Sequence, residues 1–265
     1  MAILIFGSEG MLGKYICRYC SYRQIPYIGI SRKEIDVMKL SFKIISNILS
    51  FLKFNYVINC IAVRNETLEN MYLINSLFSI NLSSYCLEKN IRMIHISTNS
   101  VFSKKNNSRH ELDIPIPINN YSISKLKGEP SNCCVIRTSI IGEDDNSKYL
   151  LETIKNSKVF HGYSKVFWNG VTCLELTEVI LNTIINGVLW DGPRHIIGNT
   201  VSKYKLAKLI KEVYKCNTEI IKEETTIEDQ TLQTIYPRSI KSIFIQLQEL
   251  RNFGKLFLNE PCFIY

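Results

Sequence analysis

Three glycines near the start of the chain constrain its fold more than any other feature. The apolar residues 2–6 run directly into the loop Gly7-Ser8-Glu9-Gly10-Met11-Leu12-Gly13. Glycine permits a tight turn and a close approach of backbone to a pyrophosphate, which then sits at the N-terminus of the following helix. An ordinary strand-to-helix turn is the alternative. The apolar strand before the loop favours dinucleotide binding.

The order of apolar runs and helical stretches predicts the fold class. Expected strands are 2–6, 27–30, 56–61, 93–97 and 133–137, and expected helices are 11–22, 43–51, 71–89, 122–128, 148–155, 174–187 and 203–215. This alternation predicts an α/β fold, a Rossmann-type doubly wound parallel sheet with a small C-terminal α/β substrate-binding lobe. Residues 1–142, with parts of 160–200, are expected to form the dinucleotide-binding domain. Residues 143–265 mainly form the lobe, interleaved with the core.

Charge and cysteine content bound the partners and the compartment. The net charge is +8 without a run of five basic residues, which suits an anionic cofactor and substrate better than nucleic acid. No stretch approaches eighteen uninterrupted apolar residues, so no membrane span is expected. Nine irregularly spaced cysteines indicate a reducing, cytoplasmic compartment. Cys17 and Cys20 fall inside the first expected helix and are interpreted as packing residues, and no metal site is expected.

Tyr121 and Lys125 are four residues apart on an expected helix, so their side chains lie on the same face. A nearby cation favours phenolate and would lower the pKa of a tyrosine from its usual value of about 10. Tyr121 is therefore a candidate proton donor to a carbonyl that is being reduced.

The residues after the second expected strand bear on the choice of cofactor. An acidic residue there would hold the ribose 2′-hydroxyl of NAD, whereas this chain has Ser31 and Arg32, which can receive a 2′-phosphate. NADPH is the expected cofactor, with NADH as the alternative. Asp36 is expected either to contact the adenine or to cap the following turn.

Several further motifs, taken in order, resemble the extended short-chain dehydrogenases/reductases. They are the glycine loop, Asn59-Cys60-Ile61-Ala62, Ser97-Thr98-Asn99-Ser100-Val101-Phe102, Tyr121-x-x-x-Lys125 and Val135-Ile136-Arg137-Thr138-Ser139. Within that group the chain is most similar to the dTDP-4-dehydrorhamnose reductase branch, whose members act on nucleotide sugars. Asn169-Gly170-Val171-Thr172 and His195-Ile196-Ile197-Gly198 fit the same pattern. The resemblance covers roughly residues 1–215.

The resemblance implies a role for individual residues. Tyr121 would protonate the developing alkoxide, Lys125 would tune Tyr121 and bind the nicotinamide ribose, and Thr98 would donate a hydrogen bond to the substrate carbonyl. The implied cofactor-binding residues are Gly7, Gly10, Met11, Leu12, Gly13, Ser31, Arg32, Asp36, Asn59, Cys60, Ile61, Ala62, Asn75, Tyr121 and Lys125, with Asn75 as a structural or proton-relay asparagine. The implied substrate-binding residues are Ser97, Thr98, Asn99, Ser100, Trp168, Asn169 and Arg238.

The implied activity is NADPH-dependent reduction of the 4-keto group of a UDP- or dTDP-linked 4-keto-6-deoxy sugar. Relatives often pair through helices that flank the sheet, so a homodimer is considered. A bifunctional 3-epimerase/4-reductase and a non-catalytic NADP-binding regulatory subunit are the alternatives. Asn99 replaces the family's acidic residue, and Ser100 stands where epimerising relatives place a cysteine, for which serine is a poor substitute. His110 and His161 are interpreted as loop histidines. Arg238, the candidate to hold a pyrophosphate, lies where the resemblance is thinnest.

Overall fold

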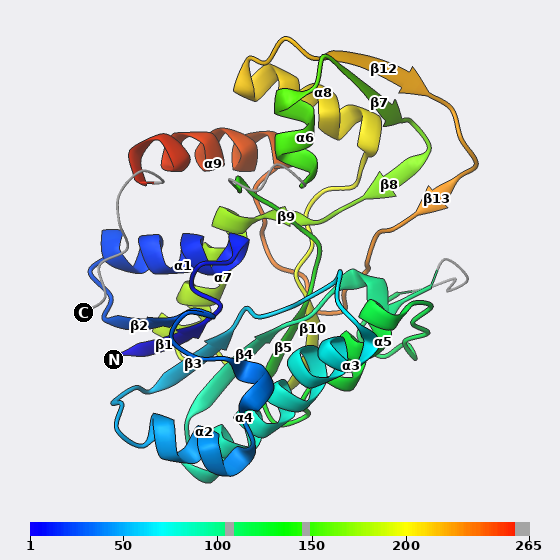
Figure 1. Ribbon diagram of the computed structural model, residues 1–265. Helices are drawn as coiled ribbons and strands as arrows, with labels where there is room; N and C mark the ends of the chain where they lie inside the picture. The colour runs from blue at the N-terminus through cyan, green and yellow to red at the C-terminus, as the bar shows by residue number, and fades with distance from the viewer. Residues whose placement is uncertain (104–108, 145–148, 258–265) are drawn as a thin grey trace.

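The computed structural model describes residues 1–103, 109–144 and 149–257. Its centre is a six-stranded sheet of order β10-β5-β4-β3-β1-β2, in which every pairing is parallel (Figure 1). The strands are β1 (Ile3–Phe6), β2 (Tyr27–Ile30), β3 (Tyr56–Asn59), β4 (Arg92–Ile96), β5 (Cys134–Arg137) and β10 (Gly192–His195). The predicted fold class is confirmed. Strand β10 was not predicted, because it is short and contains a glycine and a proline, both poor strand formers.

Helices cover both faces of the sheet. On one face, α1 (Met11–Tyr22) and α7 (Cys173–Ile185) pack over a core that includes Ile5, Ile94 and Ile136. On the other, α2 (Phe42–Leu49) and α4 (Phe78–Glu88) pack over Phe6, Val57 and Val135. Because successive strand residues point to opposite faces and both faces are buried, the strands read as continuous apolar runs.

The expected helix 71–89 has an irregular first half. It consists of α3 (Leu68–Met71), the π-helical η2 (Tyr72–Leu77) and α4. π-Helical turns are rare and are often found near functional sites. This turn carries Asn75, whose amide nitrogen donates to the Val63 carbonyl at 2.8 Å and to the Ser124 hydroxyl at 2.9 Å. Asn75 thereby ties the loop after β3 to α5 (Asn120–Lys127).

The smaller lobe lies at one end of the sheet (Figure 1). It contains α6 (Leu150–Asn156), β7 (Val159–Tyr163), β8 (Val166–Trp168), β11 (Val201–Ser202), α8 (Lys203–Tyr214), β12 (Glu219–Glu223) and β13 (Glu228–Asp229). Strand β7 pairs with β12, and β8 pairs with both β11 and β13. Two short strands, β6 (Ile140–Ile141) and β9 (Val171–Thr172), pair with each other. Lys148, where the fifth expected helix (148–155) was to start, and residues 258–265 of the expected lobe lie outside the described residues.

The C-terminal helix α9 (Ile243–Phe257) was not predicted. It packs against α7 and α8, and the ring of Phe253 stacks on Tyr15 of α1 with 6.0 Å between centroids. Its buried residues Ile243, Leu247 and Leu250 follow the spacing of one helix face, which is the signal that could have found it. None of the helices in the described ranges is both long and apolar enough to cross a membrane.

Candidate active site

The glycine loop forms a cradle at the start of α1. Gly7 has a φ of +81°, and a Cβ on Gly13 would lie 2.0 Å from the Gly7 carbonyl oxygen, so both positions require glycine. The cradle borders a cavity of about 220 Å³. Its lining includes the predicted residues Gly7, Gly10, Ser31, Arg32, Asp36, Cys60, Ile61 and Ala62. Met11, Leu12 and Gly13 form the first turn of α1 beside it.

The charges around the cradle are distributed unevenly. Glu34 accepts a hydrogen bond from the Ser31 backbone N–H at 2.7 Å, and Glu9 pairs with Lys33 at 2.8 Å. Arg32 lines the cavity and has no carboxylate partner within the described part of the chain. Asp36 caps the turn η1 (Val37–Lys39) by accepting from the Met38 N–H at 3.2 Å, which confirms one of its two predicted roles.

Thr98, Tyr121 and Arg64 meet where β4 ends and α5 begins. The phenol of Tyr121 lies near Thr98 and Arg64, and the Arg64 guanidinium lies 4.5 Å from the centre of the tyrosine ring. Burial raises the pKa of Tyr121, and the charge of Arg64, together with the polar groups of Thr98 and Arg64, opposes that rise. The prediction that a cation beside Tyr121 brings its pKa below the usual value is therefore wrong. The cation itself is Arg64, which sequence spacing did not identify.

The side chain of Lys125 is buried and is held at the end of β4. Its Nζ donates to the Ile96 carbonyl at 2.6 Å and lies 3.4 Å from Nε2 of His95. Burial lowers the pKa of Lys125 from 10.5 to about 8. These contacts explain why Lys125 does not lower the pKa of Tyr121.

A buried polar network continues from Lys125 through His95. The Nδ1 atom of His95 lies 2.8 Å from the Ser79 hydroxyl and 3.3 Å from the amide nitrogen of Asn59. Burial, reinforced by the charge of Lys125, holds the pKa of His95 well below its usual value. Asn59, predicted to line the cofactor site, thus contacts His95, which in turn contacts Lys125. Sequence reasoning missed His95, although a polar residue inside an apolar strand is itself a signal.

Three predicted substrate-binding side chains have structural partners instead. The Ser97 hydroxyl donates to Glu129 at 2.5 Å, and Glu129 pairs with Arg137 at 2.7 Å, which fastens the end of α5 to β5. The amide of Asn169 exchanges two hydrogen bonds with the backbone of Leu232, at 2.8 and 3.0 Å. The Trp168 ring is only 3% exposed and donates to the Ser139 hydroxyl at 2.7 Å. These side chains position the site rather than line it.

A cavity of about 520 Å³ in the lobe lies next to the Thr98 loop, and the sequence did not reveal it. It is lined by Leu150, Phe160, His161, Tyr163, Val166, Lys203, Thr225, Thr226, Glu228 and Gln230. Asn99 donates to the Gln230 carbonyl at 3.0 Å, which connects this cavity to the turn η3 (Asn99–Val101). Ser100, in the same turn, has its hydroxyl 3.0 Å from that of Thr98. His161 lies in β7 and contacts Glu223, so its interpretation as a loop histidine is wrong.

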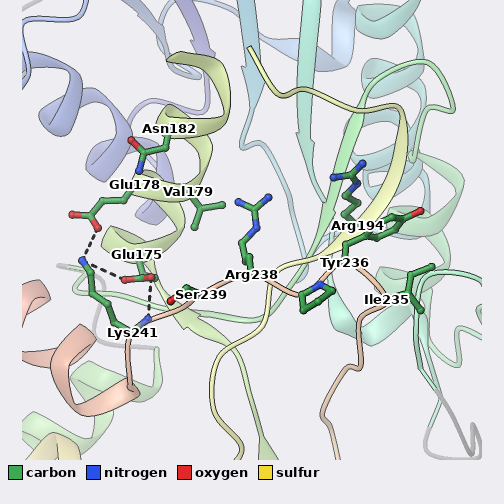
Figure 2. A pocket seen from close by; sticks show the side chains of 11 residues that line it. Glu175, Glu178, Val179, Asn182, Arg194, Ile235, Tyr236, Arg238, Ser239 and Lys241 are labelled. Carbon is green, nitrogen blue, oxygen red and sulfur yellow. Dashed lines mark hydrogen bonds and ion pairs between the residues drawn. The ribbon is translucent and has the colours of Figure 1, made fainter. Parts of the chain in front are cut away.

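Arg238 does not join this group of residues. It lies with Arg194 at a third cavity, of about 730 Å³, between α7 and β10 (Figure 2). The structure gives no support to its predicted role in holding a pyrophosphate beside Tyr121. The sequence around Arg238 carries no pattern that would have placed it on this side of β10.

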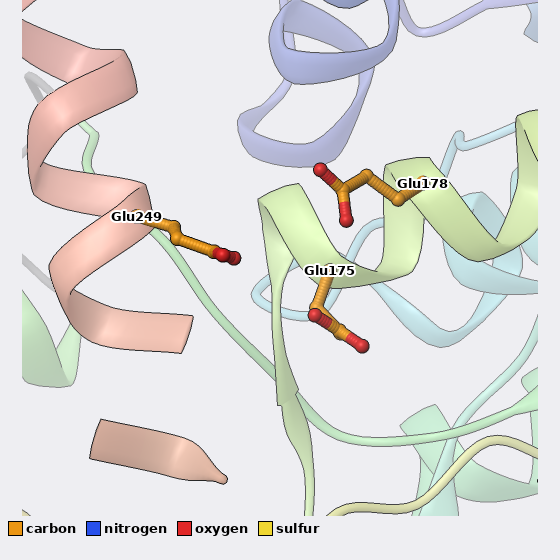
Figure 3. Close-up of side chains that lie close together, drawn as sticks. All are labelled: Glu175, Glu178 and Glu249. Atoms are coloured by element: carbon orange, nitrogen blue, oxygen red, sulfur yellow. The ribbon is translucent and has the colours of Figure 1, made fainter. Parts of the chain in front are cut away.

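Within the described ranges, one cluster of carboxylates is tight enough to hold a metal ion: Glu175, Glu178 and Glu249 (Figure 3). Lys241 already fills its centre. The Nζ atom lies 3.6 Å from Glu175 and 2.7 Å from each of Glu178 and Glu249. The ammonium group of Lys241 therefore supplies the positive charge that these carboxylates require, and it joins α7 to α9.

Comparison with known proteins gives a consistent result. The sequence model of the RmlD substrate binding domain matches residues 1–248. A curated relative, the dTDP-4-keto-6-deoxy-D-glucose reductase of Streptomyces niveus, is 26% identical over 150 residues, which is 51% of each chain. The chain therefore matches about half the length of that relative.

Solved structures of dTDP-4-dehydrorhamnose reductases share the fold. The enzyme from Clostridium acetobutylicum aligns with a TM-score of 0.82 at 20% identity, over 96% of this chain and 100% of that one. The enzyme from Bacillus anthracis, solved in complex with NADP, aligns with a TM-score of 0.82 at 18% identity, over 95% and 98%. A hypothetical member from Sulfolobus tokodaii aligns with a TM-score of 0.74 at 25% identity, over 88% and 92%.

Proposed function

Because the chain belongs to the RmlD substrate binding domain family, we propose that it reduces the 4-keto group of a nucleotide-linked 4-keto-6-deoxy sugar with NADPH. The observation that carries the proposal is the meeting of Tyr121, Thr98 and Arg64, whose neighbours in the chain line or contact two cavities. The cavity of the glycine cradle reaches Val63, next to Arg64. The cavity of the lobe reaches Gln230, which is bonded to Asn99 beside Thr98. A cofactor and a sugar would thus meet at the phenol.

The residues of the cradle fit a dinucleotide. The close approach of Gly13 to Gly7 leaves no room for a side chain at position 13, in the first turn of α1, where backbone N–H groups and the helix dipole favour a pyrophosphate. Arg32 offers a guanidinium to a 2′-phosphate. The Bacillus anthracis reductase binds NADP, and a dTDP-glucose 4,6-dehydratase of similar fold binds NAD. NADPH is therefore favoured, with NADH as the alternative. The bound cofactor would supply the hydride.

The proton comes from Tyr121 in this proposal. Its raised pKa keeps the phenol protonated at neutral pH, so that it can donate to the oxygen on which negative charge develops. Arg64 and Thr98 then stabilise the phenolate that is left behind. Lys125 is held by Ile96 and His95 below this group. In this proposal Lys125 binds the nicotinamide ribose, as the Tyr121-x-x-x-Lys125 motif implies.

The lobe cavity suits the nucleotide part of the substrate. Phe160 and Tyr163 provide aromatic rings, and Lys203 provides a positive charge. The Lys203 ammonium lies 5.5 Å from the ring of Trp168, and burial lowers its pKa. A dTDP-linked sugar is favoured because the curated relative is named for one. No observation favours epimerisation, since the Ser100 hydroxyl bonds with Thr98.

Removal of the Tyr121 hydroxyl group tests the proposal. Tyr121→Phe is expected to lower kcat for NADPH oxidation with dTDP-4-keto-6-deoxyglucose by about 10²–10⁴-fold, the usual contribution of a general acid. The dissociation constant for NADPH should change by less than about threefold, because the ring remains in place. Tyr72→Phe, at an exposed ring on η2, is the matched control. Wild-type turnover by Tyr121→Phe would refute the assignment of the acid. NADPH binding without any turnover by the wild-type chain would favour the regulatory-subunit alternative.

A further inference from the structure

The cavity that contains Arg194 and Arg238 lies on the opposite face of the sheet from α5. In β10, His195 pairs with Arg137, whose side chain binds Glu129 at the end of α5. Arg194 pairs with Ile136, which belongs to the core under α1 and α7. Since neighbouring strand residues point to opposite faces, Arg194 projects toward α7. The cavity is therefore separate from the site around Tyr121.

Two guanidinium groups share this cavity (Figure 2). Arg194 lies between two aromatic rings, 4.6 Å from the centre of Trp190 and 4.3 Å from the centre of Tyr236. Arg238 lies 6.0 Å from the centre of Trp190. Both guanidinium groups thus lie near the ring of Trp190 in one cavity, and burial together with the charge of Arg194 lowers the pKa of Arg238.

The carboxylates near Arg194 and Arg238 form ion pairs with another residue. Glu175 and Glu178 line the same cavity, but their ion pairs are with Lys241. Within the described part of the chain, neither Arg194 nor Arg238 has a carboxylate partner. By contrast, Arg92, Arg109 and Arg137 are paired with Asp191, Asp229 and Glu129, respectively. Two adjacent cations without a counter-ion are unfavourable unless an anion neutralises them.

We propose that the cavity formed by Arg194, Arg238, Tyr236 and Trp190 is a second anion site, which binds a phosphate-bearing small molecule. Stacking on the rings fixes the plane of the Arg194 guanidinium, so its N–H groups are pre-oriented for bidentate contact with phosphate oxygens. Asn182 and Ser239 line the same cavity and add neutral polar groups at its wall. A volume of about 730 Å³ accommodates a ligand larger than a single phosphate ion.

Calorimetric titration with inorganic pyrophosphate tests the site directly. The full chain is first saturated with NADPH, so that the glycine cradle does not compete for the probe, and the ionic strength is held constant. The wild-type chain is expected to bind one pyrophosphate with a dissociation constant on the order of 100 µM. The double variant Arg194→Gln/Arg238→Gln should bind pyrophosphate at least about tenfold more weakly, because both guanidinium groups are removed.

Two further variants separate loss of the site from loss of net positive charge and from misfolding of the double variant. Lys89→Gln/Lys208→Gln also removes two positive charges, from exposed lysines on α4's C-terminal side and on α8, and should bind within about twofold of wild type. Arg238→Gln alone leaves the stacked Arg194 intact and should weaken binding about fivefold, even if the double variant folds poorly. Absence of saturable binding to the wild-type chain would overturn the proposal. Equal affinity of wild type and Arg238→Gln, or equal loss in the lysine control, would overturn it as well.

Discussion

The glycine cradle and the segment from Gln230 to Lys241 both shape a cavity, but they are held in opposite ways. In the cradle, Gly7 and Gly13 contact each other six positions apart. The 230–241 segment is held by partners far away in sequence: Asn99 bonds to Gln230, Asn169 to Leu232, and Glu111 to Ile235. The shape of the first is encoded locally, and that of the second depends on the finished fold.

The largest expected effect is at the cradle. In Gly13→Ala the new Cβ would lie 2.0 Å from the Gly7 carbonyl oxygen, so backbone must move. We expect a loss of about 4 kcal/mol in the free energy of unfolding, at the upper end for single substitutions, and no measurable NADPH binding. Urea denaturation and cofactor titration measure these effects.

Gly10→Ala is the matched control. Its Cβ would lie 3.2 Å from the same oxygen, a contact that small shifts relieve, and we expect a loss below about 1 kcal/mol. Comparable losses in the two variants would show that the cradle is not specified by the Gly7–Gly13 approach.

This contrast explains which parts could be predicted from the sequence. The cradle, the strand before it and the Tyr121 helix follow from neighbouring residues, and the structure has them close to the expected positions. Arg64 and Lys203 could not be assigned, because they approach the site only when β3 and α8 are assembled. His95 carried a signal, as a polar residue inside the apolar strand β4, but its partners follow only from the assembled fold. For the same reason Ser97 and Asn169, identified by motif, proved to have structural partners. Arg238, predicted to hold a pyrophosphate of the substrate, lies instead at the cavity between α7 and β10.

Substitution of Asn169 tests whether long-range hydrogen bonds hold the 230–241 segment in place. In Asn169→Ala, the N–H and carbonyl groups of Leu232 lose both partners. At about 1–3 kcal/mol for each buried group left unsatisfied, we expect a loss of about 3 kcal/mol. Hydrogen exchange should show faster exchange across residues 230–241, with the glycine cradle unaffected.

A second variant at the same position separates the two hydrogen bonds. Asn169→Asp keeps the oxygen that accepts from the Leu232 N–H but cannot donate to the Leu232 carbonyl. At neutral pH its carboxylate is buried against that carbonyl, so it should lose at least as much stability as Asn169→Ala, and protonation of the carboxyl at low pH should restore part of the loss. If the rate of hydrogen exchange in residues 230–241 is unchanged in Asn169→Ala, the segment is held by its other contacts. The hydrogen bonds of Asn169 to Leu232 would then not be what holds it in place.

The smallest expected effect concerns Lys125, which belongs to the locally predicted helix but owes its pKa to the assembled fold. Burial lowers that pKa from 10.5 in the unfolded chain to about 8. Between these values the unfolded chain binds more protons than the folded one, so this group makes stability rise with pH. Below pH 8 the penalty for burying the charge is present in full. From pH 7 to pH 9 its partial relief should add about 1 kcal/mol to the free energy of unfolding.

Lys125→Met provides the reference for this measurement. Buried thiols such as Cys20 and Cys86 have raised pKa values and favour unfolding as pH rises, but their shifts come from burial alone, so they are common to both chains and cancel in the difference. The stability of wild type minus that of Lys125→Met should therefore increase between pH 7 and pH 9. A difference that stays flat would mean that the ammonium of Lys125 retains its ordinary pKa. In that case the contacts to Ile96 and His95 offset the cost of burial, and the surroundings of Lys125 leave its acidity unchanged.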